Sequence, residues 1–362
     1  MLLAVKFTDK YLERNRPLFI NPVLGVGPED PRRPGIPVVA FTYYPFTGGH
    51  TQANFSVYDG KFRSGDHGFN IDFDLDNPPP KQKGERRIIL TGGSAAWGWG
   101  ASSNDKTMGP VIERALSACK VRVINLAMSG SSVYANYIAL NEWGHALEPD
   151  AIISFSGAND MWVPPYPYVH GMNLLNGFVA ATFPANTPPH LAKLFARFPG
   201  IFEHTGLGLA IRTTFIADYE EAAAKDYRQR FLSDDEIVTA RFKGVVPQYV
   251  HAHKSIKRDF SGIPILVAYQ PYMARPGNRG QAGMTDAQIA EYLPRYEAFI
   301  KETSQQLRGN MNDEWLFFNA HAFYQERMLK DFDPKDGVHM SDEKQQIFGA
   351  ELARLAARWV CK

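Results

Sequence analysis

The sequence predicts an α/β protein with a central parallel sheet covered by helices, and two patterns lead to this fold class. Short apolar runs at 87–91, 121–127 and 151–156 each end in a turn of small or polar residues, and stretches with helical spacing follow the first two. Uninterrupted apolar runs of this length are typical of strands buried on both faces. Their alternation with helices indicates a parallel sheet between two helical layers.

The later elements continue this alternation to the end of the chain. Helices are expected over 107–119 and 133–147, after the first two strands. Ser233 begins a Ser-x-x-Glu capping box that opens a helix to about residue 260, and Pro247 should kink or divide that helix. The remaining expected elements are a strand over 263–269, a capped helix from Thr285, a strand over 315–319 and a last helix from Ser341.

Two segments depart from the alternation. Residues 1–84 are rich in Pro and Gly and lack helical periodicity, so we expect an irregular N-terminal arm with short strands that wraps a main domain over 85–362. An insertion at about 161–232 begins with an aromatic, Pro-rich stretch around Trp162. A lid beside a binding site and a purely structural excursion both explain such an insertion.

Composition and charge exclude several classes of protein. Lys and Arg number 39 against 38 Asp and Glu, so the chain lacks the basic surface of a nucleic-acid-binding protein. No apolar run is long enough for a transmembrane segment, and no signal peptide is visible, which predicts a cytoplasmic protein, with export as the alternative. Two cysteines exclude a disulfide-rich scaffold and a cysteine zinc site.

Chemically useful residues follow the ends of the expected strands. Ser94 follows the first strand after two glycines, Gly130 follows the second and Asn159 follows the third. Asp336 and His339 form a D-x-x-H motif before the last helix. Because the carboxyl ends of parallel strands share one edge, where open α/β sheets bind their ligands, these residues are expected to form one site.

The residue types fit acyl transfer. This chemistry needs a nucleophile, a general base within hydrogen-bond reach and a group that orients the base. The carboxylate of Asp336 can fold back to Nδ1 of His339, which leaves Nε2 to face the Ser94 hydroxyl. The backbone N–H groups of Ser94 and Gly130, with the Asn159 amide, can stabilise an oxyanion.

Around these residues the sequence resembles the SGNH/GDSL hydrolases, a superfamily of serine esterases with a flavodoxin-like three-layer α/β/α core. The resemblance covers roughly residues 85–362, and one departure is that Gly93 stands where the family's name has Asp. The matching blocks are Gly92-Gly93-Ser94-Ala95, Asn125 to Gly130, Gly157-Ala158-Asn159-Asp160 and Asp336-Gly337-Val338-His339.

The resemblance implies a nucleophile, Ser94, a base, His339, and an orienting carboxylate, Asp336. It also implies an oxyanion hole of Ser94, Gly130 and Asn159, and it requires neither cofactor nor metal. The expected activity is hydrolysis of a small-molecule, carbohydrate or lipid ester through an acyl-enzyme. An acyltransferase with the same triad and a binding module with an idle triad are the alternatives, and the oligomeric state stays open.

Other features of the sequence have simpler explanations. Asp160 is expected to be structural rather than catalytic. Gly98-Trp99-Gly100 suggests a dinucleotide-binding loop, but the third glycine of that motif is missing. His251 and His253 lie two residues apart on an expected helix, so they face different ways and do not predict a metal site.

A flavodoxin-like order would also bring the two cysteines together. The helix that ends at Cys119 and the last helix, which ends at Cys361, would lie side by side with their carboxyl ends at the edge opposite the site. The two thiols would then come within reach of a disulfide. Because no signal peptide is visible, two free thiols remain the alternative.

Overall fold

The computed structural model describes the parts of the chain that carry the expected sheet. Residues 1–40 of the arm and 163–234, which include most of the expected insertion and Ser233, lie outside the described residues. Asp336 also lies outside them. The described residues are 41–44, 48–51, 53–54, 56–57, 61–65, 67–162, 235–273, 286–308, 314–327 and 337–361.

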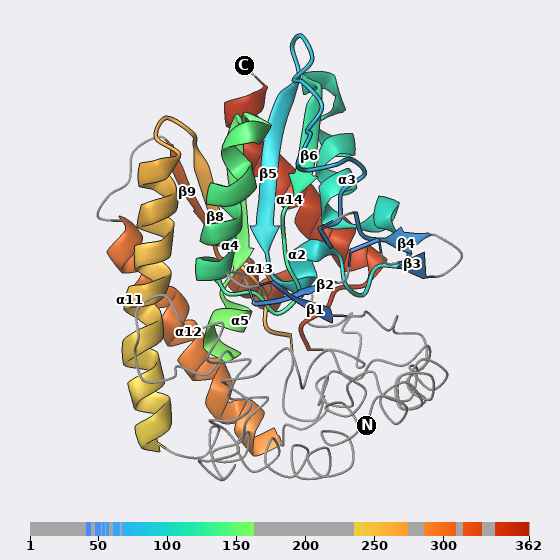
Figure 1. Ribbon diagram of the computed structural model, residues 1–362. Helices are drawn as coiled ribbons and strands as arrows, with labels where there is room; N and C mark the ends of the chain where they lie inside the picture. Colours follow the sequence, from blue (N-terminus) through green and yellow to red (C-terminus); the bar gives the residue numbers. More distant parts are fainter. Residues whose placement is uncertain are drawn as a thin grey trace, which may run out of the picture. The chain divides into compact units, whose positions relative to one another are not determined.

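A five-stranded parallel sheet forms the centre of this region (Figure 1). Its strand order is β6-β5-β7-β8-β9, which is 2-1-3-4-5 in chain order, the flavodoxin-like order. The predicted α/β fold class is therefore confirmed. The strands are β5 (Arg86–Gly92), β6 (Val121–Asn125), β7 (Ala151–Ser156), β8 (Ile265–Tyr269) and β9 (Trp315–Phe318).

Helices cover both faces of the sheet. In Figure 1, α14 lies behind the sheet against α3, and α4 lies in front of it beside α11, which also contacts α12. Every residue of β7 and β8 is buried, as expected for strands between two helical layers. The helices are α3 (Met108–Ala115), α4 (Val133–Ala139), α11 (Asp235–Asp259), α12 (Asp286–Arg308) and α14 (Asp342–Val360).

Some helices differ from the sequence-based expectation. Pro247 does not divide α11, which runs unbroken. The proline ring is exposed, so the backbone carbonyl four residues earlier, which receives no hydrogen bond from the proline nitrogen, can bond to water. The expected helix over 133–147 is α4 followed by a π-helical turn over Leu140–Gly144 and a 3₁₀ turn over His145–Leu147.

Three short helices were not expected. They are α2 (Ser94–Trp97), α5 (Ala158–Trp162) and α13 (Ala320–Arg327). The start of α13 has a local cause, because the Asn319 side chain accepts the backbone N–H of Ala322 at 2.9 Å as an N-terminal cap. The sequence pattern alone predicts Asn319 as the last residue of a strand over 315–319. None of the helices in the described residues combines the length and apolar character that crossing a membrane requires.

The described part of the arm has short strands, as expected, and packs on the sheet domain. Phe62 packs edge-on against Trp97 and Phe69 against Trp143. The Trp97 indole N–H also donates to the Gly68 carbonyl at 2.9 Å. The arm's antiparallel pairs are β1 (Phe41–Tyr44) with β2 (Gly48–Thr51) and β3 (Ser56–Val57) with β4 (Phe62–Arg63).

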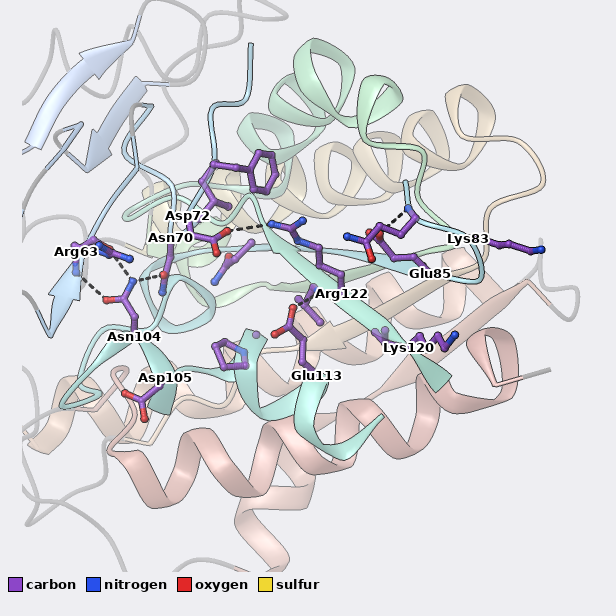
Figure 2. A pocket seen from close by; sticks show the side chains of 18 residues that line it. Arg63, Asn70, Asp72, Lys83, Glu85, Asn104, Asp105, Glu113, Lys120 and Arg122 are labelled. Carbon is purple, nitrogen blue, oxygen red and sulfur yellow. Dashed lines mark hydrogen bonds and ion pairs between the residues drawn. The ribbon is translucent and has the colours of Figure 1, made fainter. Parts of the chain in front are cut away.

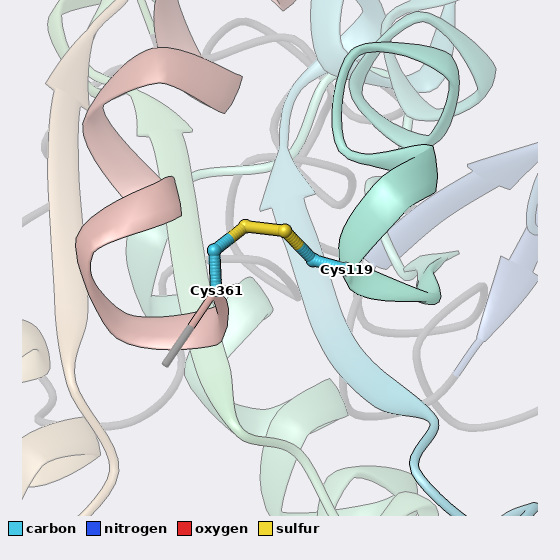
Figure 3. The surroundings of a disulfide bond; sticks show 2 residues. All are labelled: Cys119 and Cys361. Carbon is cyan, nitrogen blue, oxygen red and sulfur yellow. A yellow bond between two sulfur atoms is a disulfide. The ribbon is translucent and has the colours of Figure 1, made fainter.

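The two cysteines form a disulfide (Figure 3). Cys119 ends a 3₁₀ turn after α3, and Cys361 is the C-terminal cap of α14. Their Cα atoms are 5.1 Å apart, although 242 residues separate them in the sequence. The bond therefore joins the ends of two neighbouring helices, as the flavodoxin-like order predicted.

Replacing both cysteines by serine should lower the free energy of unfolding by roughly 2–5 kcal/mol, because the bond closes a very long loop in the unfolded chain. Urea unfolding of the oxidised protein and the double variant measures this difference. Intact mass before and after reduction is the control, since the native protein should gain two hydrogens. Two freely alkylated thiols in the oxidised protein would contradict the structure.

A hydrogen-bonded histidine is buried between α11 and β7. His253 is fully buried, with Nδ1 at 3.0 Å from the Tyr249 carbonyl and Nε2 at 3.0 Å from Ser154 Oγ. A carbonyl only accepts hydrogen bonds, so Nδ1 carries the proton and Nε2 accepts from the serine. Burial lowers the pKa of His253 to about 4, because the charged form would lose its hydration.

Acid should therefore destabilise the fold through His253. In the unfolded chain a histidine takes up a proton below pH ~6.5, whereas the folded protein resists it down to about pH 4. The stabilisation is complete above pH ~6.5 and is lost as the pH falls towards 4, by up to roughly 3 kcal/mol. Urea unfolding from pH 7.5 to 4.5 should show a shallower pH dependence in His253→Gln than in the native protein. His251→Gln, an exposed neighbour, is the matched control and should keep the native pH dependence.

Candidate active site

The strand register brings three of the predicted site residues to one edge of the sheet. Leu90 pairs with Asn125, Gly92 with Phe155, and Ser156 with Tyr269, so β5, β6, β7 and β8 end together. The segments that carry Ser94, Gly130 and Asn159 therefore leave the sheet side by side. In Figure 1 the arrows of the sheet point down towards this edge.

A sharp turn positions Ser94 directly after β5. Gly92 has a φ of +153°, and a Cβ there would lie 2.1 Å from the Phe155 carbonyl oxygen, so only glycine fits. Helix α2 begins at Ser94, and the backbone N–H of Trp97 donates to the Gly93 carbonyl at 3.0 Å. The Ser94 side chain thereby lies at the carboxyl end of β5.

His339 reaches Ser94 from the far end of the chain. Its Nε2 lies 2.8 Å from Ser94 Oγ, across 245 residues of sequence. Backbone bonds hold the His339 segment in place, from the Met273 N–H to the Gly337 carbonyl at 2.7 Å and from the Met340 N–H to the Trp99 carbonyl at 3.3 Å. The predicted serine–histidine pair is thus within hydrogen-bond distance, whereas the role of Asp336 stays a prediction.

The Gly130 loop is tied to the Ser94 turn. The Gly92 carbonyl accepts the backbone N–H of Met128 at 3.0 Å and the Ser131 hydroxyl at 2.8 Å. Asn159 joins them, because its Nδ2 donates to the Ser131 carbonyl at 3.0 Å. An amide nitrogen has two hydrogens, so this bond leaves the second one for another acceptor. Gly130 itself is exposed, with a φ of +74° that favours glycine.

The structure explains why glycine precedes Ser94. Gly93 has a φ of −86°, which any residue can adopt, so its backbone does not require glycine. The constraint is the space beside it, because a Cβ at Gly93 would lie 2.2 Å from Nδ2 of Asn159. The carboxamide of Asn159 therefore covers the position where the GDSL name has Asp.

Asp160 supports this arrangement. One carboxylate oxygen accepts the Val133 N–H at 2.9 Å, and the other accepts the Gly157 N–H at 3.1 Å. It links the start of α4 to the turn after β7, which agrees with a structural role.

Sequence reasoning missed two residues beside this site. Gln270 follows β8 and is buried, with Oε1 only 3.7 Å from the position of a Cβ on Gly93. Its polar side chain directly after the apolar run 265–269 was an available signal. Trp99 stacks on the His339 ring, but the sequence analysis considered its segment only as a dinucleotide loop.

A hollow of about 760 Å³ lies along β6, away from Ser94, Asn159 and His339 (Figure 2). Some of its charged side chains have hydrogen-bond or ion-pair partners. Arg122 forms an ion pair with Asp72 at 3.2 Å, and Glu113 accepts the Val123 backbone N–H at 2.7 Å. Burial raises the pKa of Glu113. Because β6 is an edge strand, these groups cover backbone that could otherwise pair with another chain.

One group among the described residues has metal-ligand geometry. Donor atoms of His67, Asp74 and Asp76 lie within 4.8 Å of one another, and both aspartates are exposed. None of them belongs to the predicted site. Both ring nitrogens of His253 are engaged in hydrogen bonds inside the fold.

No protein-family model and no curated protein matches the sequence. The chain is similar in fold to bacterial lipases and acylhydrolases. The lipase/acylhydrolase from Enterococcus faecalis is 14% identical, with a TM-score of 0.41 over 75% of this chain and 95% of that one. The extracellular lipase from Streptomyces rimosus is 13% identical, with a TM-score of 0.40 over 74% and 99%.

A lipase from a goat rumen metagenome is 11% identical, with a TM-score of 0.44 over 76% of this chain and 98% of that one.

Proposed function

We propose that the protein is a serine hydrolase that cleaves an ester through an acyl-enzyme intermediate. The observation that carries the proposal is the 2.8 Å separation of Ser94 Oγ and His339 Nε2 at the carboxyl edge of the sheet. Nucleophilic catalysis by serine requires this contact, because the base must take the hydroxyl proton as the oxygen attacks.

The remaining roles follow from the arrangement around this pair. Ser94 Oγ attacks the ester carbonyl, and His339 takes its proton and then gives it to the departing alcohol. Water, activated by His339, hydrolyses the acyl-enzyme and releases the acid. Asp336 is the proposed partner of His339 Nδ1, on the basis of the D-x-x-H spacing.

Three donors are proposed for the oxyanion of the tetrahedral intermediate. They are the backbone N–H groups of Ser94 and Gly130 and the second amide hydrogen of Asn159. The bond from Asn159 to the Ser131 carbonyl supports this assignment, because it fixes the amide before substrate binds. Preorganised donors of this kind need no rearrangement when charge develops on the oxygen.

The disulfide supports the exported alternative for the compartment of the protein. Bonds between cysteines persist in oxidising compartments and are rare in the cytosol. We therefore place the proposed hydrolase outside the cytosol, where carbohydrate and lipid esters are accessible substrates. The proposal covers small-molecule, carbohydrate and lipid esters as substrates.

Ser94→Ala should abolish both fluorophosphonate labelling and hydrolysis of p-nitrophenyl acetate, because it removes the attacking oxygen. The fold should persist, since Gly92 and Gly93 rather than the hydroxyl form the turn. Mass mapping of the labelled native protein should identify Ser94. Label on another residue would refute the assignment, and an unlabelled native protein would favour the idle binding module. Product analysis with acceptor alcohols separates hydrolase from acyltransferase.

Gly93→Ala should lower kcat by roughly 10- to 100-fold, because the new methyl group must displace the Asn159 amide. The fold should survive, since the clash is with the end of a side chain. Asn159→Ala, which removes the amide altogether, should produce a larger loss, of roughly 10²–10³-fold. Gly109→Ala, on α3, is the matched control: its Cβ would make an ordinary 3.6 Å contact with Val123, so kcat should not change. Native kcat in Gly93→Ala would remove Asn159 from the proposed oxyanion hole.

A further inference from the structure

Trp99 contacts two parts of the proposed site with one side chain. Its ring stacks on the His339 imidazole, with centroids 5.5 Å apart and planes 28° from parallel. Its indole N–H donates to Ser129 Oγ at 2.5 Å. Ser129 directly precedes Gly130, so the indole bridges the proposed base and the loop of the proposed oxyanion hole.

The backbone of Trp99 is fixed from both sides. Its N–H donates to the Ser94 carbonyl at 3.0 Å, and its carbonyl accepts the Met340 N–H at 3.3 Å. Gly100, with a φ of +90°, allows this approach, since a Cβ there would lie 2.6 Å from the Met340 carbonyl oxygen. The residue therefore connects the nucleophile turn directly to the segment that carries His339.

This placement has a chemical consequence for a histidine base. An imidazole can rotate about its side-chain bonds, and a small rotation moves Nε2 out of line with the serine hydroxyl. A stacked indole opposes that rotation. The indole face also attracts the imidazolium that forms when the base takes the proton.

Trp97 lies on the same turn and touches the Trp99 ring, with centroids 6.4 Å apart, but its indole N–H bonds outside the proposed site. It is completely buried, its indole N–H donates to the Gly68 carbonyl at 2.9 Å, and it packs against Phe62 of the arm. Its N–H and this aromatic contact serve the arm rather than the proposed site. The two tryptophans are thus a natural matched pair of equal size and similar burial.

We infer that Trp99 is a positioning residue that holds the His339 ring in line with Ser94 and fixes the Gly130 loop through Ser129. The inference rests on the proposed function. It adds to the proposed machinery a residue other than the serine, the histidine and the oxyanion donors. Trp99 acts through these groups and does not itself touch the reacting atoms.

Three substitutions separate the two contacts of the indole. Trp99→Phe keeps an aromatic face for His339 but loses the N–H, so kcat should fall by about 2- to 10-fold, the effect of one hydrogen bond. Ser129→Ala removes the same bond and should cause the same loss. Trp99→Leu also removes the stacking and should lower kcat by roughly 10²-fold through misalignment of the base. KM for p-nitrophenyl acetate should change much less than kcat in each variant.

A double-mutant cycle and the Trp97 control make the test specific. Trp99→Phe combined with Ser129→Ala should lose no more kcat than either change alone, because both remove one bond. Trp97→Phe should lower the melting temperature but keep kcat within about 2-fold. A loss of kcat in Trp97→Phe equal to that in Trp99→Phe, or native kcat in Trp99→Phe and Ser129→Ala, would overturn the inference. These readouts use Trp99→Phe, which retains an aromatic ring, so they do not depend on the folding of Trp99→Leu.

Failure of the inference is distinguishable from failure of the proposed function. If Ser94→Ala keeps native hydrolysis, the proposed function is wrong and the Trp99 inference falls with it. If the native protein is labelled at Ser94 and Ser94→Ala is inactive, but the Trp99 variants match the native kcat, only the positioning role is wrong.

Discussion

The parallel pairing of β5 with both β6 and β7 is the constraint on which the rest of the structure depends. It sets the ends of neighbouring strands level, so that the chain leaves the sheet three times at one edge. Each exit carries a different part of the proposed chemistry: Ser94 after β5, Gly130 after β6 and Asn159 after β7. A shift in register would separate these groups without changing a single local element.

Close approach of backbone segments then assembles the site at that edge. The Gly92 carbonyl binds the Gly130 loop through Met128 and Ser131, and the Asn159 amide lies against Gly93. A Cβ on Gly92 would lie 2.1 Å from the Phe155 carbonyl oxygen of β7, and a Cβ on Gly93 would displace the Asn159 amide. The two glycines therefore do more than turn the chain, since they make room for the loops that surround the nucleophile.

Helices α3 and α14 connect the two ends of the sheet. At the edge that carries Ser94, Asp342 at the start of α14 accepts the backbone N–H and the hydroxyl of Ser102, at 2.7 and 2.6 Å, and Gln345 donates to the Ala95 carbonyl at 3.1 Å. At the opposite edge, the disulfide joins the end of α14 to the 3₁₀ turn that follows α3. Because α14 follows His339 and α3 follows Ser94, this double attachment restrains the serine relative to the histidine.

Local sequence patterns determined the strands, their flavodoxin-like order and the serine–histidine pair. They could do so because burial on both faces leaves continuous apolar runs, and because nucleophile and base lie in turns that the order of elements places together. The same patterns could not assign α13. By sequence pattern Asn319 is the last residue of a strand, whereas in the structure its side chain caps the start of a helix. Nor could they explain the glycine at position 93. Its φ is one that any residue can adopt, and only the Asn159 side chain occupies the space that a Cβ would need. Trp99 was ambiguous for the same reason, since its partners Ser129 and His339 are 30 and 240 residues away.

The sequence by itself determined which chemical groups reach the edge of the sheet. Only the tertiary structure decided how they are held there, because the contacts that hold them join segments far apart in the chain.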